Sequence, residues 1–337
     1  MHPTIRLSRS ANVFTRGHHA FDDKPPAVNI AMLVGHATVR RQIMGPDYKR
    51  TATDDEIRRM GDLVLARSLV EEALALAKDM DDRTLTPHAL NALGDLAGRQ
   101  GNYAGARALL TEALAVSRAL GDRRLITDQL LSLSVVADED ATARSLLEES
   151  LGISRETGDR LATAEALNCL GAVMARESDH VTARSLYEQS LAICRRIGAK
   201  DGIAQSLSGL ADVARLQGDH VLALSLYRQS AAIWADLGEK LEWPHALDCM
   251  AMVLHALGRD HRAVPLWSAA DALRRRIGLP RPRYEADEHD RLISAARVTL
   301  GSDRFGAAWA VGLATAIDRM LTMVLEDAPA PGSRDTP

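Results

Sequence analysis

Residues 203–240 read IAQSLSGLADVARLQGDHVLALSLYRQSAAIWADLGEK, and this stretch decides the fold. Its first half places apolar residues such as Leu207 and Leu210 at helical spacing. Gly218 and Asp219 interrupt that pattern, as expected for a residue that ends one helix and a residue that caps the next. A second apolar stripe follows and ends at a glycine, so the stretch predicts a hairpin of two helices.

The same pattern recurs along the chain. One column contains only alanine, at steps of 40, 37, 40, 40 and 40 residues: Ala66, Ala106, Ala143, Ala183, Ala223 and Ala263. A fixed period of this size predicts a stack of like units instead of one globular core. The unit at 125–158 is three residues shorter and lacks the turn glycine, which predicts a truncated first helix there.

Composition limits the classes of fold and function. Apolar residues make up 46% of the 337 residues and aromatic residues only 4%, which favours closely packed helices over sheets. The formal net charge of −4 gives no indication of a nucleic-acid or membrane partner, and we expect neither. Cys169, Cys194 and Cys249 show no disulfide or metal spacing, so we expect a reducing, cytoplasmic location.

The repeat resembles the tetratricopeptide repeat, or TPR. Leu207, Leu210 and Ala211 occupy the positions of its first helix, and Ala223 and Tyr227 those of its second. The resemblance implies an all-α, right-handed superhelix of antiparallel helix hairpins. The 40-residue period, longer than the usual 34, is similar to the arrays of LuxR- and AfsR-type bacterial regulators.

The repeat pattern predicts the domain organisation. We expect a poorly ordered segment at 1–52, about six repeat units at 53–280, a helical cap at 281–326 and a disordered tail at 327–337. The string ARVTLGSDRFGAAWAVGL in the cap is similar to the C-terminal end of the same regulators. The arginines of the run 274–276 are interpreted as a solvated helix end.

Residues 24–64 have a different character and resemble an internal piece of the N-acyl-D-amino-acid deacylases, which are metal-dependent hydrolases. That resemblance makes a hydrolase the alternative function. Such a site needs several histidine and carboxylate ligands, yet His18 and His19 are adjacent and cannot both face inward from a strand. No nucleotide-binding GxxxxGK[ST] loop, GxSxG or CxxC motif occurs either, so we expect no enzyme activity, no metal and no cofactor.

A polar row on the first helix of each unit is the candidate binding surface. In the TPR family this helix lines the inner face, where a protein or peptide segment binds. The row contains Asn91, Asp95, Arg99, Asn168, Arg176, Ser208, Asp212, Arg215, Asp248 and His255. Two interpretations stay open: a solvated helix face, or a groove for a partner. The second predicts a protein–protein interaction scaffold in bacterial regulation or signalling.

Overall fold

The computed structural model describes residues 70–72, 74–75, 77, 84–99, 101–238, 241–277, 281, 283–316 and 319–320. These ranges contain helices and turns and no strand, which confirms the predicted all-α class. The predictions for 1–52 and 327–337, and the deacylase-like stretch 24–64, lie outside the described residues. Within the described ranges, no helix is both long enough and apolar enough to cross a membrane.

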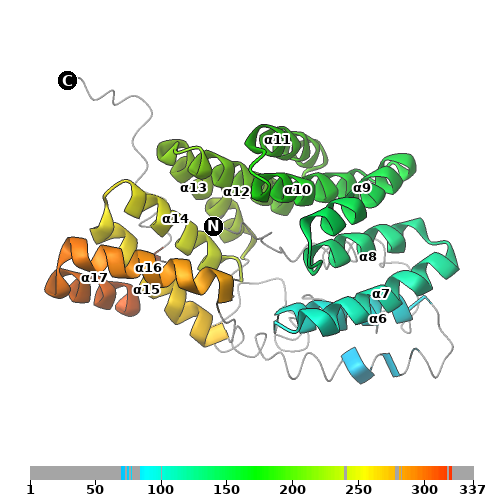
Figure 1. Ribbon diagram of the computed structural model, residues 1–337, viewed down its shortest axis with the longest axis horizontal. Coiled ribbons are helices and arrows are strands. Elements are labelled where there is room, and N and C mark those ends of the chain that lie inside the picture. Colours follow the sequence, from blue (N-terminus) through cyan, green and yellow to red (C-terminus); the bar gives the residue numbers. More distant parts are fainter. Residues whose placement is uncertain are drawn as a thin grey trace. The chain divides into compact units, whose positions relative to one another are not determined.

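The helices follow one another as hairpins (Figure 1). In chain order they are α6 (Thr86–Arg99), α7 (Tyr103–Leu120), α8 (Arg123–Val135), α9 (Asp140–Thr157), α10 (Arg160–Arg176), α11 (His180–Ile197), α12 (Lys200–Leu216), α13 (His220–Leu237), α14 (Trp243–Ala256), α15 (Asp260–Ile277), α16 (Arg283–Leu300) and α17 (Ser302–Ala314). We call α6, α8, α10, α12 and α14 the first helices, and their partners α7, α9, α11, α13 and α15 the second helices.

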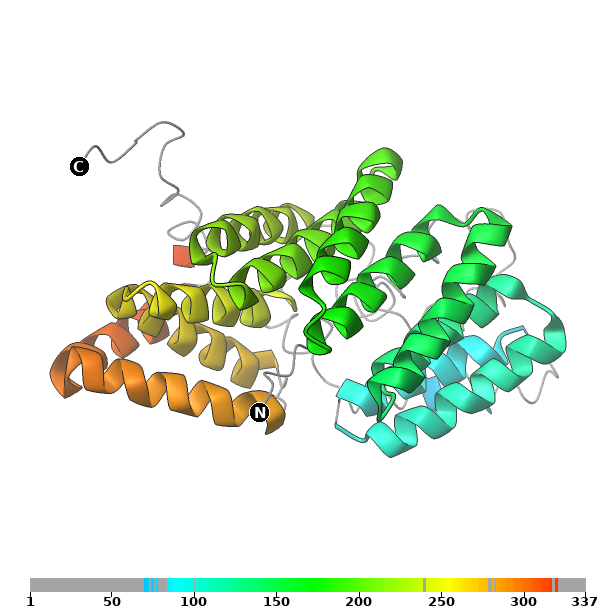
Figure 2. The ribbon, with the colours of Figure 1, turned by 45° about the horizontal axis from the view of Figure 1, so that its top comes forward.

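Contacts divide the chain into two compact units, whose helices can be followed in Figure 2. The first unit contains α6 to α11 and α12 as far as Gly209, together with Ile277–Leu279. The second unit contains the rest of α12 from Leu210 and helices α13 to α17. Each unit is described by itself below.

The turns between helices use the glycine and aspartate that the sequence predicted. Gly218 has a φ of +83°, a left-handed conformation that side chains with a Cβ rarely adopt. Asp219 follows it, and its carboxylate accepts a hydrogen bond from the backbone N–H of Leu222 at 3.0 Å. Asp179 caps α11 in the same way, through the N–H of Thr182. The predicted hairpin turn is therefore confirmed at residue level.

The shortened unit also has the predicted structure. Helix α8 has 13 residues, whereas α10 has 17, and its C-terminal cap is Val136, where α10 has Glu177. The loop after α8 leads directly into α9, whose first residue Asp140 is acidic and lies at the positive end of that helix.

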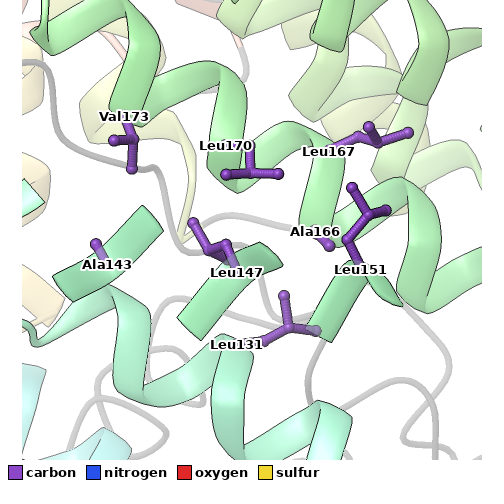
Figure 3. Packing of buried hydrophobic residues seen from close by; sticks show 8 residues of the cluster. All are labelled: Leu131, Ala143, Leu147, Leu151, Ala166, Leu167, Leu170 and Val173. Carbon is purple, nitrogen blue, oxygen red and sulfur yellow. The ribbon is translucent and has the colours of Figure 1, made fainter. Parts of the chain in front are cut away.

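Apolar columns pack the hairpins onto one another. Figure 3 shows Leu131 of α8, Leu147 of α9 and Leu167 of α10 in one buried cluster. Each is at most 4% exposed, and burying such a leucine contributes about 1.5–3 kcal/mol. The alanine column predicted from the period is buried wherever it is described: Ala106, Ala143, Ala183, Ala223 and Ala263. These small residues let adjacent helices approach closely.

A candidate partner-binding surface on the first helices

The first helices are enclosed, whereas the second helices expose one face. In α10, no residue from Leu161 to Arg176 is exposed, while α11 alternates buried residues with exposed ones such as Glu188. The polar row of the first helices shares this burial: Asn91 is 7% exposed, Asp95 4% and Asn168 6%. The interpretation of that row as a solvated face is therefore wrong for these three residues.

Two asparagines at equivalent repeat positions carry incompletely bonded amides. Asn168 Oδ1 accepts a hydrogen bond from Ser206 at 3.0 Å, but its Nδ2 has no hydrogen-bond partner among the described residues. Asn91 Oδ1 is buried and equally without a partner in that part of the chain. Gln205, on the next first helix, has a buried Nε2 in the same condition. A buried polar group left unbonded costs about 1–3 kcal/mol, so these atoms are suited to bind a ligand.

Hydroxyl groups fix the orientation of Asn168. Ser206 Oγ lies 3.0 Å from Asn168 Oδ1 and 3.2 Å from Ser190 Oγ. Ser190 in turn donates to the backbone oxygen of Ala164 at 2.8 Å. This chain joins α10, α11 and α12 and is fully buried at both serines. Ser206 was not among the predicted residues, although the repeat contains a signal: a serine stands where the neighbouring repeats have Ala166 and Ala246.

In the second unit, Asp212 and Arg215 are bound to a tyrosine. Tyr227 donates a hydrogen bond of 2.6 Å to Asp212 Oδ1, and Arg215 lies 3.6 Å from the same oxygen. Burial, followed by the negative charge of Asp212, raises the pKa of Tyr227 well above its usual value, so the phenol stays a donor. Burial opposes the charge of Arg215, but Tyr227 and Asp212 outweigh it and raise the pKa of that guanidinium.

In α14, the predicted residues Asp248 and His255 are paired with other side chains of the chain. Asp248 is 5% exposed and binds Arg274 at 2.8 Å and Arg281 at 2.7 Å. His255 Nδ1 lies 2.5 Å from Asp260 Oδ1. The interpretation of Arg274 as part of a solvated helix end is wrong, because its side chain is 8% exposed and paired.

The other predicted residues lie apart from one another. Arg176 donates to Asp140 at 2.7 Å, which joins the end of α10 to the start of α9. Ser208 is half-buried, and the side chain of Arg99 lies outside the described residues. The structure thus places Asn168 beside Ser206 and Asp212 beside Arg215. No group of three or more His, Cys, Asp or Glu side chains among the described residues could hold a metal ion.

Comparisons with known proteins agree with this architecture. The tetratricopeptide repeat profile matches residues 57–119 and 162–236. The fold is similar to that of a Rap protein complexed with competence and sporulation factor, with a TM-score of 0.55, 12% identity, and coverage of 94% of this chain and 96% of that chain.

A second solved structure has the same kind of fold. It is a signal-transduction ATPase with numerous domains and a tetratricopeptide repeat sensor from Pyrococcus horikoshii, with a TM-score of 0.51 and 15% identity. The likeness covers 86% of this chain and 45% of the ATPase.

The resemblance to deacylases is local. A D-aminoacylase of Alcaligenes xylosoxydans xylosoxydans is 51% identical over 51 residues, which are 15% of this chain and 9% of that enzyme. So short a span cannot supply the ligands of a barrel active site, and the activity of that enzyme is not carried over. The tetratricopeptide repeat profile thus matches two stretches of the chain, and the helix hairpins have the same kind of fold as these two solved structures.

Proposed function

We propose that the protein is a non-catalytic interaction scaffold that binds an extended segment of a protein partner along its first helices. One observation carries the proposal: Asn91 and Asn168 occupy the same repeat position, are buried, and each has an amide atom without a hydrogen-bond partner among the described residues. An array of repeats characteristically uses such a recurring position to bind its partner.

The chemistry of these amides fits a peptide backbone. An extended peptide presents one N–H donor and one C=O acceptor per residue, and both need partners when they are buried. A primary amide offers a donor and an acceptor together. In Asn168 the serine already satisfies the oxygen, so its Nδ2 is the group that would donate to a partner carbonyl.

The fold comparison supports this kind of role without naming a partner. The Rap protein was solved with competence and sporulation factor, and the ATPase carries its repeats as a sensor. By analogy, we place the scaffold in a bacterial regulatory or signalling system, in the cytoplasm.

The test uses a linear peptide selected for binding from a displayed random library. We expect Asn168→Ala to weaken its binding about tenfold, because one buried hydrogen bond is worth about 1.4 kcal/mol. Ser206→Ala is the matched comparison: it removes the hydroxyl that orients Asn168 but leaves the Nδ2 group in place, so it is expected to weaken binding less than Asn168→Ala does. Gln189→Ala, on the exposed face of α11, controls for the loss of an amide.

The result that would overturn the proposal is equal weakening in Asn168→Ala and Ser206→Ala, since the effect would then come from the fold alone. Binding that is unchanged in both Asn91→Ala and Asn168→Ala would have the same consequence. Turnover of N-acyl-D-amino acids by the purified chain would contradict the non-catalytic part.

A further inference from the structure

Helix α14 brings a thiol and an imidazole into contact. Cys249 Sγ lies 3.5 Å from Nε2 of His245 and 3.9 Å from its Nδ1. The two residues are four positions apart on one helix, so they lie on the same face. When the neutral imidazole carries its proton on Nδ1, Nε2 can accept the proton of the thiol. A ring nitrogen in this position is suited to activate the sulfur as a nucleophile.

One of the first helices alone combines these two groups. At the repeat position of His245, the other first helices have His88, Asp128, Glu165 and Gln205. At the position of Cys249, they have Ala92, Ser132, Cys169 and Gly209. In α10, a carboxylate therefore lies four residues before the cysteine, and a nearby negative charge opposes the formation of a thiolate. Cys249 and Cys169 thus share a repeat position but not a chemical environment.

The repeat also places a tyrosine ring beside the sulfur. In one hairpin, a Cβ added to Gly209 would meet the ring of Tyr187. Cys249 and Tyr227 occupy the same two positions of the repeat, 40 residues later. Burial raises the pKa of Tyr227 most, and the negative charges of Asp212 and Cys249 raise it further, which agrees with a sulfur close to the phenol.

A guanidinium belongs to the same group of side chains. Arg215 lies 3.6 Å from the oxygen of Asp212 that accepts the hydrogen bond of Tyr227. Burial opposes the charge of Arg215, whereas Tyr227, Asp212 and Cys249 raise its pKa. A cation near the sulfur stabilises the thiolate that forms when the thiol loses its proton. All of these residues belong to the second unit, whereas Asn91 and Asn168 belong to the first.

We propose that Cys249, with His245 as its base, is a thiol that reacts with hydrogen peroxide. The imidazole takes the thiol proton, the sulfur attacks one oxygen of the peroxide, and the O–O bond breaks. The imidazolium returns its proton to the hydroxide that leaves. The sulfur is oxidised to a sulfenic acid, and the peroxide is reduced, with its second oxygen released as water. Cys249 is 6% exposed, which favours an oxidant as small as hydrogen peroxide over a bulky reagent.

The other two cysteines are internal controls. Burial raises the pKa of the Cys194 thiol to about 11, so this sulfur stays protonated and inert at neutral pH. Cys169 is more exposed than Cys249 but has Glu165 at the position of the imidazole. Exposure alone therefore predicts that Cys169 reacts first, whereas the presence of a base predicts that Cys249 does.

The test exposes the full chain at pH 7 to a limiting amount of hydrogen peroxide. The chain is then unfolded, its remaining thiols are alkylated with iodoacetamide, and each cysteine is measured by peptide mass spectrometry. We expect Cys249 to be oxidised at least about tenfold faster than Cys169 and Cys194, because a positioned base accelerates such a step. When peroxide is added in urea instead, we expect the three cysteines to react at similar rates.

Variants test the role of the imidazole. His245→Gln is expected to slow the oxidation of Cys249 at least about tenfold at pH 7. The two rates are expected to converge as the pH rises past the ordinary thiol pKa of about 8.5, since the thiol then ionises without a base. A purely structural effect would not depend on pH in this way. His88→Gln is the matched control, because it removes an imidazole at the same repeat position of α6, where no cysteine follows four residues later.

Three results would overturn the proposal. The first is an oxidation of Cys249 in the folded wild-type chain that is no faster than that of Cys169, which requires no variant. The second is an equal effect of His245→Gln and His88→Gln on the oxidation of Cys249. The third is a reduction by His245→Gln that is as large at pH 9 as at pH 7.

Discussion

Asn168 and Asp248 occupy the same position of the repeat, two units apart, and have opposite surroundings. Asn168 is held by one hydroxyl and keeps an amide nitrogen without a hydrogen-bond partner among the described residues. Asp248 is held by Arg274 and Arg281, and Arg281 lies beyond the last hairpin. One position of the repeat thus keeps an unbonded amide nitrogen at Asn168 and forms ion pairs with two arginines at Asp248.

The difference shows why a repeat position does not define a function. The backbone sets where the side chain lies, but neighbouring charges decide whether it is available. The repeat pattern alone predicts the same binding role for Asn168 and Asp248. In the structure, Asp248 is ion-paired with two arginines, whereas the proposed binding role falls on Asn168.

The largest expected effect tests the structural role of Asp248. Asp248→Ala leaves two buried arginines without their shared carboxylate, which is expected to destabilise the protein by about 3–5 kcal/mol. Asn168→Ala is expected to cost only about 1 kcal/mol. Denaturant unfolding followed by circular dichroism measures the free energy of unfolding of both variants. Similar losses would show that Asp248 is no more important for stability than Asn168.

A smaller effect concerns Tyr187 of α11. A Cβ on Gly209 would lie 2.6 Å from Cδ1 of Tyr187, whereas the equivalent position in the next unit accepts Cys249. Gly209→Ala is therefore expected to destabilise by about 1–3 kcal/mol, because the ring must move. Gly152→Ala is the control: that glycine has open space around it in α9 and is expected to gain up to about 1 kcal/mol. Equal stability of both variants would show that Tyr187 can shift without cost.

We expect acid to lower the stability of the protein through Asp271, which lies in the second unit. Burial tends to raise its pKa, but hydrogen bonds from His289 and Arg281 outweigh burial, so the pKa lies below the ordinary 3.8. A carboxyl whose pKa is lowered by folding stabilises the protein above 3.8, and that stabilisation is lost as the pH falls through the folded-state pKa. Thermal unfolding measured across this range should depend less on pH in Asp271→Asn than in the wild type. If Asp271→Asn has the same pH dependence as the wild type, Asp271 does not cause the loss of stability in acid.

The smallest effect is expected at the surface of the first unit. Arg118 and Glu149 form an ion pair of 2.7 Å, with side chains that are 51% and 42% exposed. Glu149→Gln is expected to change stability by less than about 1 kcal/mol, because water and salt screen such a pair. If Glu149→Gln lost as much stability as Asp248→Ala, the burial of an ion pair would not determine how much it stabilises this protein.

The hairpins could be predicted because their causes are local in the sequence. Helical spacing of leucine and alanine, a turn glycine and a capping aspartate all act within one unit, and the period repeats them. The shortened α8 was also predictable, since three missing residues and a missing glycine are visible directly.

The contacts of the polar row could be predicted only in part, because burial and pairing depend on residues far away in the chain. Asp248 pairs with arginines 26 and 33 positions later, and no periodicity relates them. For the same reason the ion pair of Arg274 could not be predicted, because its partner Asp248 lies on another helix. Asn91 and Asn168 are both buried, as expected for residues at one position of the repeat.

The serine chain between α10, α11 and α12 has a consequence for how the units stack. Apolar columns of nearly identical spacing cannot distinguish one neighbour from another, so a repeat chain risks packing a helix against the wrong unit. Ser206 Oγ lies within hydrogen-bonding distance of Ser190 Oγ and Asn168 Oδ1 only when α12 packs against α10 and α11, so any other stacking would lose these contacts between helices. We infer that these three residues select the correct neighbour during folding.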